Sequence, residues 1–165
     1  MFIDFTEVEL IAGDGGKGSV SFRREKYIPK GGPDGGDGGR GGHIVFKSDS
    51  NLQTLQDIRY RRKYKAEKGS GGGGARKTGR NGKDVTVLVP VGTLLKRKGD
   101  PTILADLVEN GQTVVICSGG KGGRGNIRFK TSTNQAPRTS QPGLPGESGD
   151  FEIELKVLAD VGLVG

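Results

Sequence analysis

Three glycine motifs with the spacing G-x-G-x-x-G are the first candidates for chemistry in this sequence. They begin at Gly13, Gly36 and Gly120, and each runs into a short β-type segment that ends in Phe and a basic residue. A dinucleotide site needs this turn to open a helix, whose N-terminus then binds the pyrophosphate. A P-loop needs Gly-Lys-Ser/Thr, and in the nearest match Lys17 precedes the second glycine. The motifs therefore favour a structural role for the glycines.

Basic residues gather in clusters that suit contact with phosphate groups. Residues 58–65, IRYRRKYK, would carry a row of cations on one face if they form a strand. Further clusters lie at residues 23–30, 76–80, 96–98 and 128–138. Their number, and their position in predicted loops, favours contact with the phosphate backbone of RNA. Residues 128–141 have few apolar side chains and suit an exposed contact loop.

The remaining candidates for catalysis or metal binding are few. His43 is the only histidine and has no Cys pair as a partner, so a metal site has little support. Asp34 and Asp37 lie in a glycine run, where turn-forming and solvated roles are the default. Cys117 ends an apolar run, which predicts a buried small hydrophobe. We therefore expect no catalytic constellation, metal ion or cofactor in this chain.

The composition limits the class of protein. The chain has 165 residues, enough for one domain or for one domain and the start of another. Its 32 glycines leave room for a modest apolar core only. The formal net charge of +7 indicates an anionic partner, either nucleic acid or a membrane surface. The sequence has no membrane span, no signal region and one cysteine, so we expect a cytoplasmic, monomeric protein.

Short apolar runs bounded by Gly, Pro, Asp or Asn predict a mostly β fold with much irregular structure. The predicted strands are residues 8–12, 20–22, 43–46, 85–89, 113–117 and 151–158. Residues 103–108 fit either one helical turn or another strand. No amphipathic helix of ten or more residues is evident.

The glycines between these strands keep a register of three residues. One row contains Gly32, Gly35, Gly38 and Gly41, and another contains Gly119, Gly122 and Gly125. A polyproline II helix has three residues per turn, so each row leaves an edge without side chains where neighbouring helices approach. Helices packed at such edges also satisfy each other's backbone hydrogen bonds. We therefore predict a bundle of short polyproline II helices attached to a small β unit.

The last residues resemble the beginning of a second unit. Residues 159–165, ADVGLVG, form a nearly continuous apolar run, which is typical of a strand in a parallel sheet covered on both faces. Gly165 fits the first glycine of a P-loop. We therefore expect a domain boundary near Leu158.

Several long motifs resemble the bacterial Obg GTPases. They are residues 21–42, 89–93, 119–126, 133–138 and 158–165. The resemblance implies that residues 1–158 are the glycine-rich domain of that family and that residues 159–165 are the first strand of its GTPase domain. It implies the Obg fold, in which a β-barrel-like base carries a bundle of glycine-rich type II helices. It also implies association with the large ribosomal subunit during its assembly, and links to the stringent response and growth control.

The resemblance further implies a set of site residues. In the family, loops at the tip of the glycine-rich domain approach ribosomal RNA near the peptidyl transferase centre. Here the tip would comprise residues 24–30, 76–81 and 134–138. The implied phosphate contacts are Arg24, Lys26, Lys30, Lys77, Arg80 and Arg138, with Tyr27 as a candidate stacking residue. GTP or GDP and Mg²⁺ belong to the family's GTPase domain, which would also be a partner of this one.

Two other hypotheses stay open from the sequence. The chain could be a disordered, RGG-like RNA-binding segment, which would lack fixed structure in its glycine tracts. It could also bind and hydrolyse a nucleotide by itself.

Overall fold

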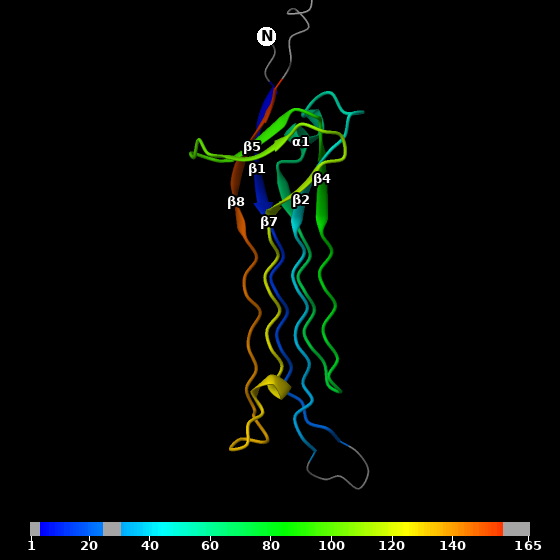
Figure 1. Cartoon of the computed structure of the whole chain (residues 1–165), viewed down its shortest axis with the longest axis vertical. Helices are drawn as coiled ribbons and strands as arrows, with labels where there is room; N and C mark the ends of the chain where they lie inside the picture. The colour runs from blue at the N-terminus through cyan, green and yellow to red at the C-terminus, as the bar shows by residue number, and fades with distance from the viewer. Residues whose placement is uncertain (1–3, 25–30, 157–165) are drawn as a thin grey trace, which may run out of the picture.

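The computed structural model describes residues 4–24 and 31–156. They form two parts along the long axis of the molecule, which we call the base and the rod (Figure 1). The base contains the strands and the rod contains extended glycine-rich segments. The predicted boundary near Leu158 and the predicted strand at residues 159–165 lie outside the described residues.

The base is built from two open sheets. The elements in chain order are β1 (Asp4–Ile11), β2 (Ile44–Ser48), α1 (Gln56–Tyr60), β3 (Lys63–Lys65), β4 (Val85–Val89), β5 (Thr93–Arg97), β6 (Ile103–Leu107), β7 (Thr113–Cys117), the 3₁₀ turn η1 (Asn126–Phe129) and β8 (Ser148–Leu155). One sheet has the order β3-β1-β8-β5-β6 and the other β4-β2-β7. Each sheet has an unpaired edge strand at either side, so the described strands form no closed barrel. The expected barrel-like base is therefore not found.

The two sheets share one apolar core because their strands alternate buried and exposed residues. In β1 and β8, Val8 pairs with Phe151 in an antiparallel register, and both side chains are buried. In β2, Ile44 and Phe46 are fully buried and belong to the same cluster. Burying one such side chain stabilises the fold by about 1.5–3 kcal/mol. The core therefore holds in place the ends of the strands that continue into the rod segments.

The predicted mostly β class is confirmed, with differences in particular elements. Residues 85–89 and 113–117 are the strands predicted, and residues 103–107 form strand β6. Residues 20–22 form no strand and contribute one isolated bridge, between Phe22 and Pro33. Strand β5 was not predicted. Of residues 58–65, considered as a possible strand, only Lys63–Lys65 form one (β3), because Leu55 and Ile58 are buried at helical spacing in and before α1.

Only short helical elements occur among residues 4–24 and 31–156. The α-helix α1 has 5 residues and η1 has 4. No described helix is long and apolar enough to cross a membrane.

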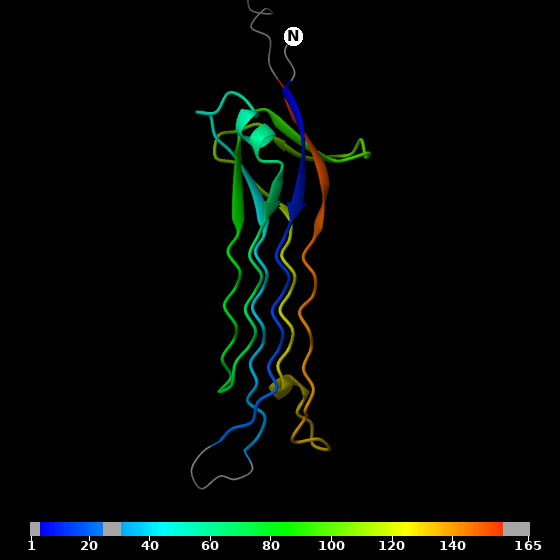
Figure 2. The ribbon, with the colours of Figure 1, turned by 180° about the vertical axis from the view of Figure 1, so that it is seen from behind.

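The rod consists of extended segments that lie side by side in both views (Figures 1 and 2). We call them segments A (residues 12–22), B (32–43), C (66–74), D (77–84), E (118–125) and F (141–147). Segments A and B lie at the centre. Segment A has backbone hydrogen bonds with B, C, E and F, and segment B has them with A, C, D and E. The rod therefore has three layers, formed by F and E, by A and B, and by C and D.

The hydrogen bonds between segments repeat every third residue. Between A and B they run from Gly13 N to Gly42 O, from Gly16 N to Gly39 O and from Ser19 N to Gly36 O, with N···O distances of 2.9, 2.8 and 2.9 Å. At Gly125 the backbone angles, φ −72° and ψ 165°, lie near polyproline II values. The polyproline II conformation of the other segments stays a prediction.

The close approach of these segments leaves no room for a side chain at most of the glycines in register. A Cβ atom added at Gly38 would lie 1.9 Å from Gly16 O, and one added at Gly41 would lie 1.8 Å from Gly13 O. The corresponding shortest distances are 2.0 Å at Gly35, 1.8 Å at Gly119, 1.8 Å at Gly122 and 2.1 Å at Gly125. Gly32 differs, because its added Cβ would meet only Lys130 Nζ, at 3.9 Å.

This contrast predicts a large loss of stability for one alanine substitution and a small change for another. Gly38→Ala forces segments A and B apart, so it should lower the free energy of unfolding by at least about 3 kcal/mol and the melting temperature by roughly 10 °C. Gly32→Ala should change the free energy of unfolding by less than about 1 kcal/mol. Thermal melting of both variants checks this. Equal stabilities would show that the backbones do not pack as described.

Candidate nucleic-acid interface

The end of the rod away from the base, which we call the tip, is where distant parts of the chain meet. It contains the ends of segments A and E, the start of segment B, the turn between C and D, and the loop that leads from η1 into segment F (Figure 1). Each segment is held in register by its neighbours, so the rod positions the side chains of the tip.

A buried asparagine holds three parts of the tip together. Asn126 is 0% exposed. Its Oδ1 accepts a hydrogen bond from Gly35 N at 2.8 Å, and its Nδ2 donates to Ser21 O and Pro137 O, both at 3.0 Å. The side chain therefore joins segments A and B to the loop before segment F. Sequence reasoning missed this residue; the only signal was a polar residue directly after a glycine run.

An ion pair fixes one arginine of the tip. The guanidinium of Arg128 lies 2.9 Å from Asp37 Oδ2, and Asp37 Oδ1 accepts a hydrogen bond from Gly125 N at 2.9 Å. Burial raises the pKa of Asp37, but the Gly125 N–H and Arg128 outweigh it, so that the net pKa lies below its ordinary value. Asp37 is therefore a backbone acceptor within the rod, and the Arg128 side chain stays 60% exposed.

The turn between segments C and D is held by another aspartate. Asp34 Oδ2 accepts from Ala75 N at 3.1 Å, and Asp34 O accepts from Arg76 N at 2.7 Å. Ala75 and Arg76 have φ angles of 55° and 61°, in the left-handed region that non-glycine residues seldom adopt. The hydrogen bonds to Asp34 stabilise this conformation. The side chain of Arg76 then lines a groove with Thr78 and Arg128.

The described contacts separate the predicted site residues into three groups. Arg24, Lys77 and Arg138 are exposed at the tip, and the guanidinium of Arg138 lies 5.5 Å from the centroid of the Phe22 ring. Arg80 lies on the side of the rod, where its Nη2 is 3.9 Å from Glu67 Oε1. Lys26, Tyr27 and Lys30 lie outside the described residues. The structure adds Arg76, Arg128 and Lys130, which had not been singled out as contacts.

The residues considered for catalysis have structural roles in the described part of the chain. His43 Nδ1 accepts a hydrogen bond from Gly119 N at 2.7 Å. Cys117 is 0% exposed, and burial, with a smaller contribution from Glu147, raises the pKa of its thiol to about 11. Among residues 4–24 and 31–156, no three His, Cys, Asp or Glu side chains lie close enough together to hold a metal ion.

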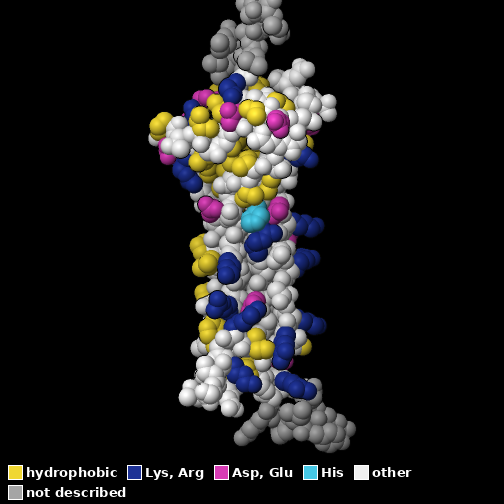
Figure 3. All heavy atoms as spheres, in the orientation of Figure 1, with side chains coloured by type: hydrophobic (Ala, Val, Ile, Leu, Met, Phe, Trp, Pro, Cys, Tyr) yellow, Lys and Arg dark blue, Asp and Glu magenta, His cyan; other side chains and the backbone are white. Residues whose placement is uncertain are grey.

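On the face of the molecule seen in Figure 3, basic and hydrophobic side chains gather in different places. Figure 3 shows Lys and Arg side chains along the rod and at its tip, whereas hydrophobic side chains gather over the base. A rod with cations at its end and on its sides is an arrangement suited to anionic polymers.

The sequence matches the family model described as GTP1/OBG over residues 3–157. The chain belongs to the GTP1/OBG family. A GTPase Obg of Chloroherpeton thalassium is 59% identical over 165 residues, which are 100% of this chain and 50% of that protein. Proteins of the same name from Chlorobaculum tepidum and Magnetococcus marinus are 54% and 55% identical over 164 residues, 99% of this chain and 49% and 42% of theirs. This chain thus spans about half the length of the curated relatives it matches.

Removal of the buried amide should destabilise this GTP1/OBG chain. Asn126→Ala leaves Gly35 N–H and the carbonyls of Ser21 and Pro137 without their partner, so we expect a loss of about 2–4 kcal/mol in the free energy of unfolding. Asn134→Ala, in the exposed loop, is the matched control and should cost less than about 0.5 kcal/mol. Denaturant unfolding measures both. Similar values for the two variants would contradict the role given to Asn126.

The ion pair of Asp37 predicts a pH dependence of stability. Since the folded-state pKa is depressed, the contribution of Asp37 is complete above its unfolded pKa, near pH 4, and is lost as the pH falls through the lower folded value. We expect Asp37→Asn to cost about 1 kcal/mol at pH 7, and the difference from the parent to shrink below pH 4. Melting curves from pH 7 to pH 2 measure it, with exposed Asp150→Asn as the control. A difference that does not shrink at all between pH 4 and pH 2 would contradict this.

Proposed function

We propose that this chain is the ribosome-binding, N-terminal part of an Obg-type GTPase that acts in assembly of the large ribosomal subunit and in growth and stringent-response control. The relatives are named GTPase Obg, and they extend well beyond the matched residues. We infer that the whole protein hydrolyses GTP with Mg²⁺, and that this chain itself is a noncatalytic, monomeric, cytoplasmic binding part. Its partners are then the large subunit with its RNA and the protein's own GTPase domain.

The observation that carries the proposal is the concentration of cations at the tip. Six are contributed by separate parts of the chain: Arg24, Arg76, Lys77, Arg128, Lys130 and Arg138. Among the described residues, only Arg128 of this group has a carboxylate partner. The other charges are therefore available for phosphate groups, which are the commonest protein contacts in nucleic-acid complexes.

The shape of the rod supports RNA as the partner. Segment B has 12 residues, which at about 3.1 Å per residue gives a rod of roughly 35 Å. Such a rod carries the tip cations well away from the base, so they can reach phosphates inside a cleft of a large ribonucleoprotein. The loop residues 131–136 are exposed and mostly polar, which suits contact with RNA better than burial against an apolar protein surface.

Cosedimentation with purified large ribosomal subunits over a series of salt concentrations tests the proposal. Simultaneous Arg24→Gln, Lys77→Gln and Arg138→Gln should weaken binding at least tenfold and reduce the slope of log K against log salt by about 2 to 3. The control removes the same charge from the base, through Lys47→Gln, Lys98→Gln and Lys156→Gln, and should bind nearly as the parent does.

Each alternative function has its own outcome. No cosedimentation of the parent at low salt would overturn ribosome binding, and equal losses in the two triple variants would overturn the assignment to the tip. Rapid amide exchange throughout the glycine segments would favour the disordered, RGG-like hypothesis. Tight binding of GTP to this chain in calorimetry would favour a nucleotide site of its own.

A further inference from the structure

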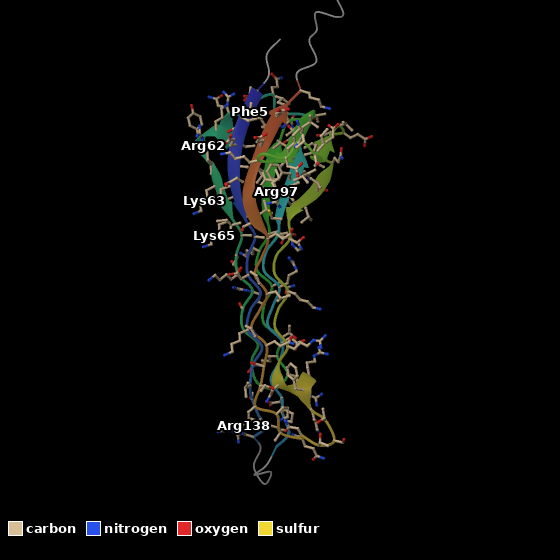
Figure 4. All side chains as sticks on the ribbon, turned by 90° about the vertical axis from the view of Figure 1, so that its left-hand side faces the viewer. Phe5, Arg62, Lys63, Lys65, Arg97 and Arg138 are labelled. Carbon is tan, nitrogen blue, oxygen red and sulfur yellow. The ribbon has the colours of Figure 1, made fainter. Side chains whose placement is uncertain are left out.

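One outer layer of the molecule carries a row of exposed cations from the base almost to the tip. The row runs along strand β3 and segments C and D, consists of Lys63, Lys65, Lys68, Arg80 and Lys83, all exposed, and ends beside Lys77 of the tip. Figure 4 shows Lys63 and Lys65 pointing to the same side, away from the core. Buried Tyr64 between them points inward, as alternation along a strand requires. We call this set the lateral row.

The hydrogen bonds of segment D fix the spacing of the lateral row. Gly79 N donates to Asp37 O and Gly82 N to Arg40 O, both in segment B, at 2.8 and 2.7 Å. Because this contact repeats every third residue, Lys77, Arg80 and Lys83 occupy equivalent positions. At about 3.1 Å per residue they follow one another at about 9 Å. This spacing is wide enough for each cation to contact a different phosphate of a nucleic-acid backbone.

Several carboxylates of the rod are exposed, and their partners are backbone N–H groups of neighbouring segments rather than the cations of this row. They accept backbone hydrogen bonds across segments: Asp14 from Gly146 N at 3.0 Å, Asp84 from His43 N at 2.8 Å and Glu147 from Ser118 N at 2.9 Å. The hydrogen bond from His43 N–H, opposed by burial and aided by Arg40, lowers the pKa of Asp84. Within the row, Lys63 and Arg80 form ion pairs with Glu9 and Glu67, at 3.7 and 3.9 Å. Lys65, Lys68 and Lys83 have no carboxylate partner among the described residues.

We propose that the lateral row is a second binding surface for the phosphate backbone of RNA, which extends the contact from the tip along the side of the rod to the base. This inference rests on the proposed function. Between residues 61 and 84, all of them described, no large apolar side chain is exposed. An interface with another protein would need apolar or aromatic anchors, whereas regularly spaced cations suit a polymer of phosphates.

The opposite outer layer provides a matched comparison. Lys121 and Arg124 of segment E line a groove together with Pro142 and Leu144 of segment F, and Leu144 is 58% exposed. This layer therefore mixes fewer cations with apolar surface. A variant that removes equal charge, at Lys121 and Arg124 of this layer and at Lys17 of the central segment A, isolates the contribution of the lateral row.

The test compares two triple variants of the protein in binding to purified large subunits over a salt series. The row variant carries Lys65→Gln, Lys68→Gln and Lys83→Gln, and the control carries Lys17→Gln, Lys121→Gln and Arg124→Gln. The row variant should bind roughly tenfold more weakly, with a log–log salt slope smaller by about 2, and the control should bind within about twofold of the parent. Melting temperatures should be unchanged, since all six side chains are exposed.

The outcomes separate this inference from the proposed function. If the row variant binds as the control does while the tip variant is weakened, the lateral row is overturned and the function stands. If the parent itself does not bind, the function fails. A third measurement uses large-subunit RNA freed of protein. A row variant that is weakened on intact subunits but not on this RNA would show that the row contacts an acidic ribosomal protein, which overturns the RNA assignment.

Discussion

The structure depends on backbone segments that pack directly against one another without side chains between them. Carbonyl oxygens lie 1.8–2.0 Å from where the Cβ atoms of Gly16, Gly38 and Gly41 would be, so these positions accept no other residue without displacement of a neighbouring segment. The same proximity lets N–H and C=O groups pair across segments every third residue. The hydrogen bonds offset the conformational entropy that so many ordered glycines lose.

This packing decides in which direction the charged side chains of the rod point. With glycines at two of every three positions in the central segments, the third position points outward and carries the residues that meet solvent or a partner. Short carboxylates at these positions, such as Asp14 and Asp37, accept hydrogen bonds from backbone N–H groups of adjacent segments. Longer cations such as Lys17 extend outward. The result is a basic surface on a chain whose net charge is only +7.

The base and the tip have different means of stability. In the base, an apolar core that includes Phe46 and Phe151 holds two open sheets together. It also fixes the strands that continue into the rod segments. At the tip no such core exists among the described residues, and polar contacts replace it. Asn126 and Asp34 satisfy backbone groups from segments that are distant in sequence. The backbone of Arg76 is therefore held by a hydrogen bond, the side chain of Arg128 by its ion pair with Asp37, and that of Arg138 by its contact with the Phe22 ring.

The sequence by itself determined the β class, the strands at residues 85–89 and 113–117, and the glycine register, because these depend on local periodicity and on the absence of Cβ atoms. It also located most basic clusters. Only the tertiary structure decided that the sheets stay open, that residues 56–60 turn into a helix against the core, and that Asn126 is buried. It also decided that Arg80 lies on the side of the rod, whereas Arg76 lines a groove with Arg128. These features arise from contacts between residues far apart in the chain, such as Gly35 and Asn126, which no local pattern encodes.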